Sequence, residues 1–235
     1  GGRGPTGGSH PRGRGPGLMP SPYSDDLADI GSQAIEQLTV RNLARERAFA
    51  ISREVIRFSA NAIRAVHRGQ FDVAQDVVNQ AGLRLKETEP MRQQNPEIYF
   101  AGFLADARKE FSEANITLAV IFGGAIPRSQ DLGVDPSSFL NGMADVIGEL
   151  RRYILDSLRR NSFERCPELM DVMDEMYGIL MTVDFPEAVT GGLRRSTDQM
   201  RGVLERTRGD LTMALRQHSL EVRLAQWEDQ RAGDV

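Results

Sequence analysis

The sequence predicts an all-α protein. Apolar residues recur at intervals of three and four along most of the chain from Tyr23 onward, which is the period of an amphipathic helix. No stretch alternates polar and apolar side chains in the way that marks a half-buried strand. The 235 residues are 40% hydrophobic and 26% charged, enough apolar material for a packed core. We therefore expect six or seven long helices in an antiparallel bundle, forming one domain over residues 23–235.

Residues 1–22 differ from the rest of the chain. They contain eight glycines and five prolines and have no periodic apolar positions. Such a segment cannot bury enough surface to offset its chain entropy, so we expect a disordered tail. The three arginines among its glycines leave open a second interpretation, an Arg-Gly arm that contacts RNA.

The first half of the domain contains three predicted helices. The first ends at Gly69, the second covers residues 71–89 and stops at Pro90, and the third starts near Pro96 and ends at Gly123. Glycine after a helix and proline beyond it are common stop signals. The apolar face of the first helix consists of Ile51, Val55, Phe58, Ala62 and Val66. That of the third consists of Phe100, Leu104, Ala107, Phe111, Ala114, Leu118 and Ile121.

The second half contains three more predicted helices. Asp135 and Pro136 have the residue types of an N-cap and a first-turn proline, so the fourth helix begins there. The fifth covers residues 164–183, and the last runs from about Ala188. The apolar face of the fourth helix consists of Met143, Val146, Leu150, Ile154 and Leu158. Long helices in a chain of this size stack side by side, and we expect the packing to continue between subunits of a closed oligomer.

Several classes of site and location are excluded or disfavoured by what the sequence lacks. One cysteine, Cys166, rules out an internal disulfide framework and a Cys-rich zinc site. No HExxH, CxxC, GxSxG or P-loop motif occurs, and neither do the Glu-x-x-His pairs of ferritin-like di-iron proteins. The longest apolar run, residues 116–126, is too short to cross a bilayer, and no signal peptide opens the chain. We expect a cytoplasmic protein with no membrane partner.

The charge distribution argues against a generic nucleic-acid binder. Residues 23–235 hold 26 basic and 33 acidic side chains, a net charge of −7. Because affinity for nucleic acid depends on neutralising phosphates, any such site must be a local basic surface. Arg53, Arg57, Arg64 and Arg68, with Asn61 between them, form one polar stripe on the first predicted helix. The stripe could follow a nucleic-acid backbone, but spacing alone favours an exposed face or a subunit contact paired with acids.

Carboxylates are the remaining candidates for chemistry. Asp106, Glu110 and Glu113 are spaced i, i+4, i+7 on the third predicted helix, and Asp145 and Glu149 are spaced i, i+4 on the fourth. If these helices pack together, four or five carboxylates converge, and such a group requires a cation such as Mg²⁺ or Mn²⁺. That site could activate water and stabilise a phosphoryl transition state. Spacing alone favours a solvated acidic face offset by Arg108, Lys109, Arg151 and Arg152.

Four segments resemble the translin superfamily. Residues 51–68 look like its first long helix, and residues 109–114 (KEFSEA) resemble the Glu-x-x-Glu-Ala stretch of translin-associated factor X, TRAX. Residues 142–150 (GMADVIGEL) resemble the Gly-(Val/Leu)-Ala-Asp-Leu-x-Gly-Glu-Leu motif, and residues 193–204 are similar to the C-terminal helix. The resemblance covers about residues 35–212 and is greatest to the prokaryotic TRAX-like branch.

The resemblance implies a subunit of a closed oligomer, commonly an octamer, that encloses RNA. In TRAX-type subunits the residues that match Glu110, Glu113 and Asp145 bind Mg²⁺ and cut single-stranded RNA internally. Glu149 also matches a family acid, and we expect it to be a fourth ligand or to orient the others, whereas Asp106 has no counterpart. Residues 100–103 read Phe-Ala-Gly-Phe where eukaryotic members carry histidine and arginine that face RNA. The expected RNA contacts here are therefore Arg53, Arg57, Arg64, His67 and Arg68, of which the last two match a family pair.

Three functions remain open from the sequence. The first is a Mg²⁺-dependent endoribonuclease that cuts single-stranded RNA, with single-stranded DNA as a further substrate. The second is an oligomeric RNA or single-stranded DNA sheath of translin type, without turnover. The third is a helical scaffold whose ligand is another protein, which the negative net charge allows. His67 has a plainer interpretation too, as a cation beside the last carbonyls of its helix.

Overall fold

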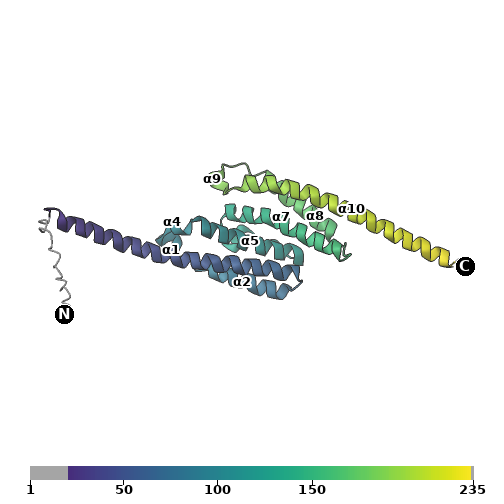
Figure 1. Cartoon of the computed structure of the whole chain (residues 1–235), viewed down its shortest axis with the longest axis horizontal. Helices are drawn as coiled ribbons and strands as arrows, with labels where there is room; N and C mark the ends of the chain where they lie inside the picture. The colour runs from purple at the N-terminus through teal and green to yellow at the C-terminus, as the bar shows by residue number, and fades with distance from the viewer. Residues whose placement is uncertain (1–20, 234–235) are drawn as a thin grey trace, which may run out of the picture. The chain divides into compact units, whose positions relative to one another are not determined.

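The computed structural model describes residues 21–233, and within them it is helical throughout, with no strand (Figure 1). The all-α class is therefore confirmed. The expected tail, residues 1–22, lies outside the described part except for its last two residues. No helix within residues 21–233 is both long and apolar enough to span a membrane.

The six long helices are α1 (Ser24–His67), α2 (Phe71–Lys86), α5 (Gly102–Phe122), α7 (Pro136–Arg159), α8 (Cys166–Met181) and α10 (Leu193–Gly233). The four short ones are α3 (Met91–Gln94), α4 (Pro96–Tyr99), α6 (Ser129–Leu132) and α9 (Glu187–Thr190).

The chain divides into two units within α1, between Leu43 and Ala44. In the first unit, the described residues bury no side chain, and apolar residues such as Leu27, Ile30 and Leu38 are exposed. The second unit contains the hydrophobic core and every candidate site residue. The single domain expected over residues 23–235 stays a prediction.

Helix α7 is the centre of the second unit. It packs against α5, α8 and α10, while α5 also packs against α2. The predicted apolar face of α7 is buried: Val146, Leu150 and Ile154 are all fully inaccessible to solvent. Burial of a side chain of this kind contributes about 1.5–3 kcal/mol. Asp135 caps the helix as predicted, with its Oδ1 accepting a hydrogen bond from the backbone N–H of Ser138 at 2.9 Å.

Helices α5 and α7 run in the same direction. Lys109 of α5 contacts Asp145 in the first half of α7, and Arg165, which follows α7, donates to the carbonyls of Val120 and Ile121 at the end of α5. Residues 123–135, which include α6, lead the chain from the end of α5 back to the start of α7. The antiparallel order expected for the bundle therefore does not extend to this pair. Arg165 also satisfies carbonyls that a helix C-terminus leaves without a partner.

The third predicted helix is interrupted. α4 ends at Tyr99 and α5 begins at Gly102, because Ala101 adopts an extended conformation. Arg108 joins the two pieces: its side chain donates to the carbonyl of Tyr99 at 3.0 Å, and its guanidinium lies 4.1 Å from the centre of the Tyr99 ring. This geometry combines a hydrogen bond with a cation–π contact. Arg108 is only 3% exposed there, so it does not offset the carboxylates of α5 as the sequence suggested.

Candidate metal centre

A glycine allows α5 and α7 to approach closely. A Cβ at Gly142 of α7 would lie 2.6 Å from the carbonyl oxygen of Lys109 and 3.0 Å from the backbone nitrogen of Glu113. Real side chains do not tolerate such distances to a backbone, so this contact requires glycine. The close approach brings the carboxylates of the two helices together.

Four of the five predicted acids lie close enough to interact electrostatically at this contact. Glu113 is 8% exposed, and its burial, followed by the charges of Glu110, Asp145 and Glu149, raises its pKa to about 8. Like charges raise the pKa of a carboxyl group only when they lie close to it. Asp106 is exposed and is not among the charges that act on Glu113. The structure therefore leaves Asp106 outside the cluster.

A lysine that the sequence analysis treated only as an offsetting charge lies within this cluster. The ammonium Nζ of Lys109 is 2.8 Å from Oδ2 of Asp145 and 3.4 Å from Oε1 of Glu110. Burial lowers the pKa of Lys109, but the hydrogen bond and charge of Asp145 outweigh it, so the pKa is raised overall. The ammonium therefore stays charged and holds two acids from different helices.

His67 contacts the fourth acid. Its Nε2 lies 2.5 Å from Oε2 of Glu149, and its side chain is only 5% exposed. The hydrogen bond from His67 is the largest cause of a lowered pKa of Glu149, which burial partly opposes. The side chain of His67 is thus buried, whereas the arginines with which the sequence grouped it are exposed. The sequence pattern alone did not distinguish a buried histidine from an exposed one.

The donor set fits Mg²⁺ or Mn²⁺, although three of the four acids already contact Lys109 or His67. Among the described residues, no three His, Cys, Asp or Glu side chains stand in an arrangement that could hold a metal ion. The ammonium of Lys109 contacts the carboxylates of Asp145 and Glu110, and the imidazole of His67 contacts that of Glu149. Four carboxylates supply only oxygen ligands, which these metals prefer. The ammonium shows that a positive charge is accommodated between α5 and α7.

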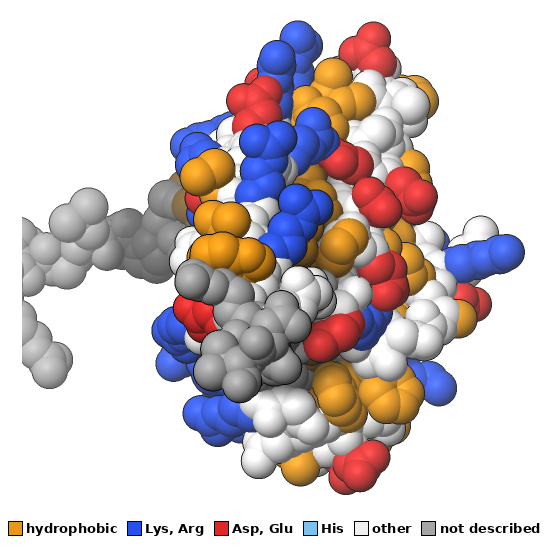
Figure 2. Space-filling view, turned by 90° about the vertical axis from the view of Figure 1, so that its right-hand side faces the viewer, with side chains coloured by type: hydrophobic (Ala, Val, Ile, Leu, Met, Phe, Trp, Pro, Cys, Tyr) orange, Lys and Arg blue, Asp and Glu red, His pale blue; other side chains and the backbone are white. Residues whose placement is uncertain are grey.

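The arginines of the predicted stripe are exposed, three of them on α1 and Arg68 in the turn directly after it. Arg53, Arg57, Arg64 and Arg68 have no carboxylate oxygen within 4.0 Å among the side chains described. Arg64 donates to Asn61 at 2.5 Å, and the Arg57 guanidinium lies 5.2 Å from the Phe58 ring centre. Elsewhere on the surface, Figure 2 shows basic side chains gathered beside acidic and apolar ones. That the four arginines bind nucleic acid stays a prediction.

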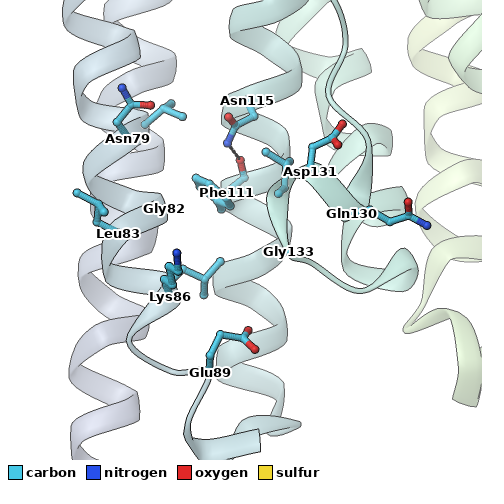
Figure 3. A pocket seen from close by; sticks show the side chains of 13 residues that line it. Asn79, Gly82, Leu83, Lys86, Glu89, Phe111, Asn115, Gln130, Asp131 and Gly133 are labelled. Carbon is cyan, nitrogen blue, oxygen red and sulfur yellow. Dashed lines mark hydrogen bonds between the residues drawn. The ribbon is translucent and has the colours of Figure 1, made fainter.

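A prominent hollow lies away from the acids. It has a volume of about 610 Å³ and is lined by α2, α5 and the turn around α6, with Phe111 and Asn115 on its α5 wall (Figure 3). These two positions are turned well away from Glu110 and Glu113 by the helical period. None of the candidate acids lines it. The acidic cluster is thus an interhelical site rather than part of this pocket.

No family model matches this chain. A protein of similar sequence, however, aligns over most of its length. This relative is an uncharacterised protein of Methanocaldococcus jannaschii. It is 31% identical over 197 residues, which cover 81% of this chain and 87% of that protein.

Solved C3PO proteins, which are of translin and TRAX type, share the fold. Structures of AfC3PO, alone and in complex with duplex RNA, are 34% identical with a TM-score of 0.73, over 78% of this chain and 95% of theirs. The structure of apo-NeC3PO, 19% identical with a TM-score of 0.69 over 84% of this chain and 100% of its own, supports the fold alone. Together with the motifs at residues 109–114 and 142–150, these likenesses show that the chain belongs to the translin superfamily.

Proposed function

We propose that this protein is a Mg²⁺-dependent endoribonuclease that cuts single-stranded RNA and accepts single-stranded DNA. The observation that carries the proposal is a cation, the ammonium of Lys109, held between Glu110 of α5 and Asp145 of α7 at the contact where Glu113 is buried. Glu110, Glu113 and Asp145 would hold the metal, with Glu149 assisting, and Mn²⁺ would substitute. A metal bound there would supply an activated water and neutralise charge on the phosphodiester.

The chain's own residues divide the remaining work. Glu113 is buried among like charges, so its carboxylate becomes fully ionised at neutral pH only when a cation is close. The four exposed arginines of the stripe supply donors that suit phosphate oxygens. An RNA complex of AfC3PO, 34% identical to this chain, supports RNA as the ligand class. In this proposal the subunits form a closed cytoplasmic oligomer, commonly an octamer in the family.

The test is cleavage of a fluorescent single-stranded RNA by the purified protein. Three reactions are compared: with Mg²⁺, with EDTA, and with the Glu113→Gln variant in Mg²⁺. Cutting in the first reaction alone supports the proposal. Binding without cutting in all three favours the non-catalytic sheath, and cutting by the variant indicates a contaminating nuclease.

Removing the charge of Lys109 is expected to strengthen metal binding, whereas removing an acid is expected to weaken it. Because its ammonium occupies the space between Asp145 and Glu110, an incoming metal must displace it. Lys109→Met removes this competitor, and we expect Mn²⁺ to bind roughly tenfold more tightly, equivalent to about 1.4 kcal/mol. Titration of free Mn²⁺ by electron paramagnetic resonance measures it. Weaker binding by the variant would instead indicate that the ammonium supports the site.

A non-catalytic RNA sheath is the second candidate, favoured by the four stripe arginines, which have no acidic partner among the described side chains. For either function we expect Arg57→Ala combined with Arg64→Ala to weaken binding of a labelled oligonucleotide. Loss of two phosphate contacts should also reduce the slope of log K against log salt by about 1.4. Fluorescence anisotropy at several salt concentrations measures both effects. Arg201→Ala with Arg216→Ala on α10 removes the same charge from exposed positions and should leave the slope unchanged.

A further inference from the structure

One side chain of α1 contacts the acidic cluster directly. His67 is the last residue of α1, and it reaches across to Glu149 in the middle of α7, with 2.5 Å between Nε2 and Oε2. The two residues are 82 positions apart in the sequence. This contact therefore depends on tertiary packing and not on local structure.

The orientation of Glu149 depends mainly on this histidine. The other cation near its carboxylate is Arg152, whose NH1 is 3.6 Å away and whose side chain is 53% exposed. At that distance an exposed pair contributes little. The hydrogen bond from buried His67 is shorter and is shielded from water, so it fixes the carboxylate far more strongly.

The imidazole ring is held by packing rather than by a second hydrogen bond. Its other nitrogen, Nδ1, is buried and has no partner among the described residues. The ring of Tyr153, one turn after Glu149 on α7, lies 6.4 Å from the His67 ring. Oε2 of Glu149 is a carboxylate oxygen and can only accept, so Nε2 is the donor of this hydrogen bond. Both the bond and its direction are thus determined by the fold.

We propose that His67 is a positioning residue, which fixes the carboxylate of Glu149 through this hydrogen bond so that Glu149 can assist the metal. The inference rests on the proposed function for the metal itself, and it assigns His67 a role inside the protein rather than in contact with RNA. Outer partners of metal-binding side chains commonly change metal affinity by 10–100-fold when they are removed. Arg64 on α1 and Arg68 just after its end are exposed and remain available to a nucleic acid.

Two variants of His67 separate its hydrogen bond from its bulk. His67→Phe keeps a ring and removes the donor, whereas His67→Gln keeps an N–H near the position of Nε2. We expect the His67→Phe variant to bind Mn²⁺ roughly 10–100-fold more weakly, measured from free Mn²⁺ by electron paramagnetic resonance, and the His67→Gln variant to recover most of the loss. In EDTA, the affinity of both for labelled RNA should equal that of the parent. His218→Gln, at the other described histidine, is the matched control.

The outcomes distinguish failure of the positioning role from failure of the metal site. If the parent binds Mn²⁺ and the His67→Phe variant binds it equally well, the positioning role is wrong and the proposed metal site stands. If both variants lose RNA affinity in EDTA, His67 acts on RNA and the inference is overturned. If the parent itself binds no Mn²⁺, the proposed function fails and the inference fails with it. Thermal unfolding of each variant verifies that it is folded, and His67→Gln tests the bond should His67→Phe unfold the protein.

Discussion

Replacing Glu113 with glutamine is expected to abolish RNA cleavage while leaving the fold intact. The substitution keeps the shape of the side chain and removes the most buried carboxylate of the cluster. Loss of a metal ligand would remove the metal's activation of water and its neutralisation of phosphodiester charge, so no cleavage above background is expected. The measurement is the initial rate of cleavage of a single-stranded RNA in Mg²⁺. Asp106→Asn, on the same helix but exposed and outside the cluster, should cut at the parent rate.

Glu113→Gln should also be more stable than the parent protein at alkaline pH in the absence of metal. The folded-state pKa of Glu113 is about 8, above its ordinary value of 4.5, so the folded protein binds more protons than the unfolded chain between these pH values. Stability therefore falls as pH rises through this window. In EDTA, we expect the free energy of unfolding of the parent to drop by about 2–4 kcal/mol more than that of the variant between pH 4.5 and 8. Parallel pH profiles of the two proteins would show that Glu113 ionises normally.

The second large effect is expected at Gly142. A Cβ there would lie 2.6 Å from the backbone oxygen of Lys109, and a backbone atom cannot move aside as a flexible side chain can. Gly142→Ala must therefore push α5 and α7 apart, at a cost of roughly 1–3 kcal/mol from overpacking. The separation also moves Asp145 away from Glu110 and Glu113. We expect a lower urea midpoint and weaker Mn²⁺ binding, measured on the same preparation.

A second glycine of α7 provides the control for this prediction. A Cβ at Gly148 would meet no atom within 4 Å. Gly148→Ala should therefore gain helix propensity, by up to about 1 kcal/mol, without disturbing the packing. If both substitutions destabilise equally, the close approach at Gly142 is not the reason for its effect.

Helical periodicity predicted most of the fold. The predicted faces of α1 and α7 are buried except for Phe58 and Leu158, which are half-buried, and the cap at Asp135 forms as expected. The break at Ala101 was missed because the apolar spacing continues in phase across it, while the backbone turns out of the helix at one residue. The parallel direction of α5 and α7 was missed as well, since periodicity identifies helices but not the path of the chain between them.

The candidate site could be predicted only in part. Spacing placed Glu110 with Glu113 and Asp145 with Glu149, and the structure brings all four together. The same spacing included Asp106, which is exposed. The contacts of Lys109 and His67 could not be predicted, because each depends on how α5 and α1 are rotated against α7. Sequence pattern shows which residues share a face, and tertiary packing decides what that face meets.

The contacts that Lys109 and His67 make with the acids have a consequence for the protein in the absence of metal. Lys109 and His67 between them contact three of the four acids, whereas Glu113 forms no salt bridge among the described residues and has a pKa raised to about 8. In small zinc domains, by contrast, the ion is needed for folding itself. A metal bound as proposed would replace the ammonium of Lys109 between two helices that are already packed. Packing of α5 against α7 would then not depend on the metal, and chelation would leave the fold intact.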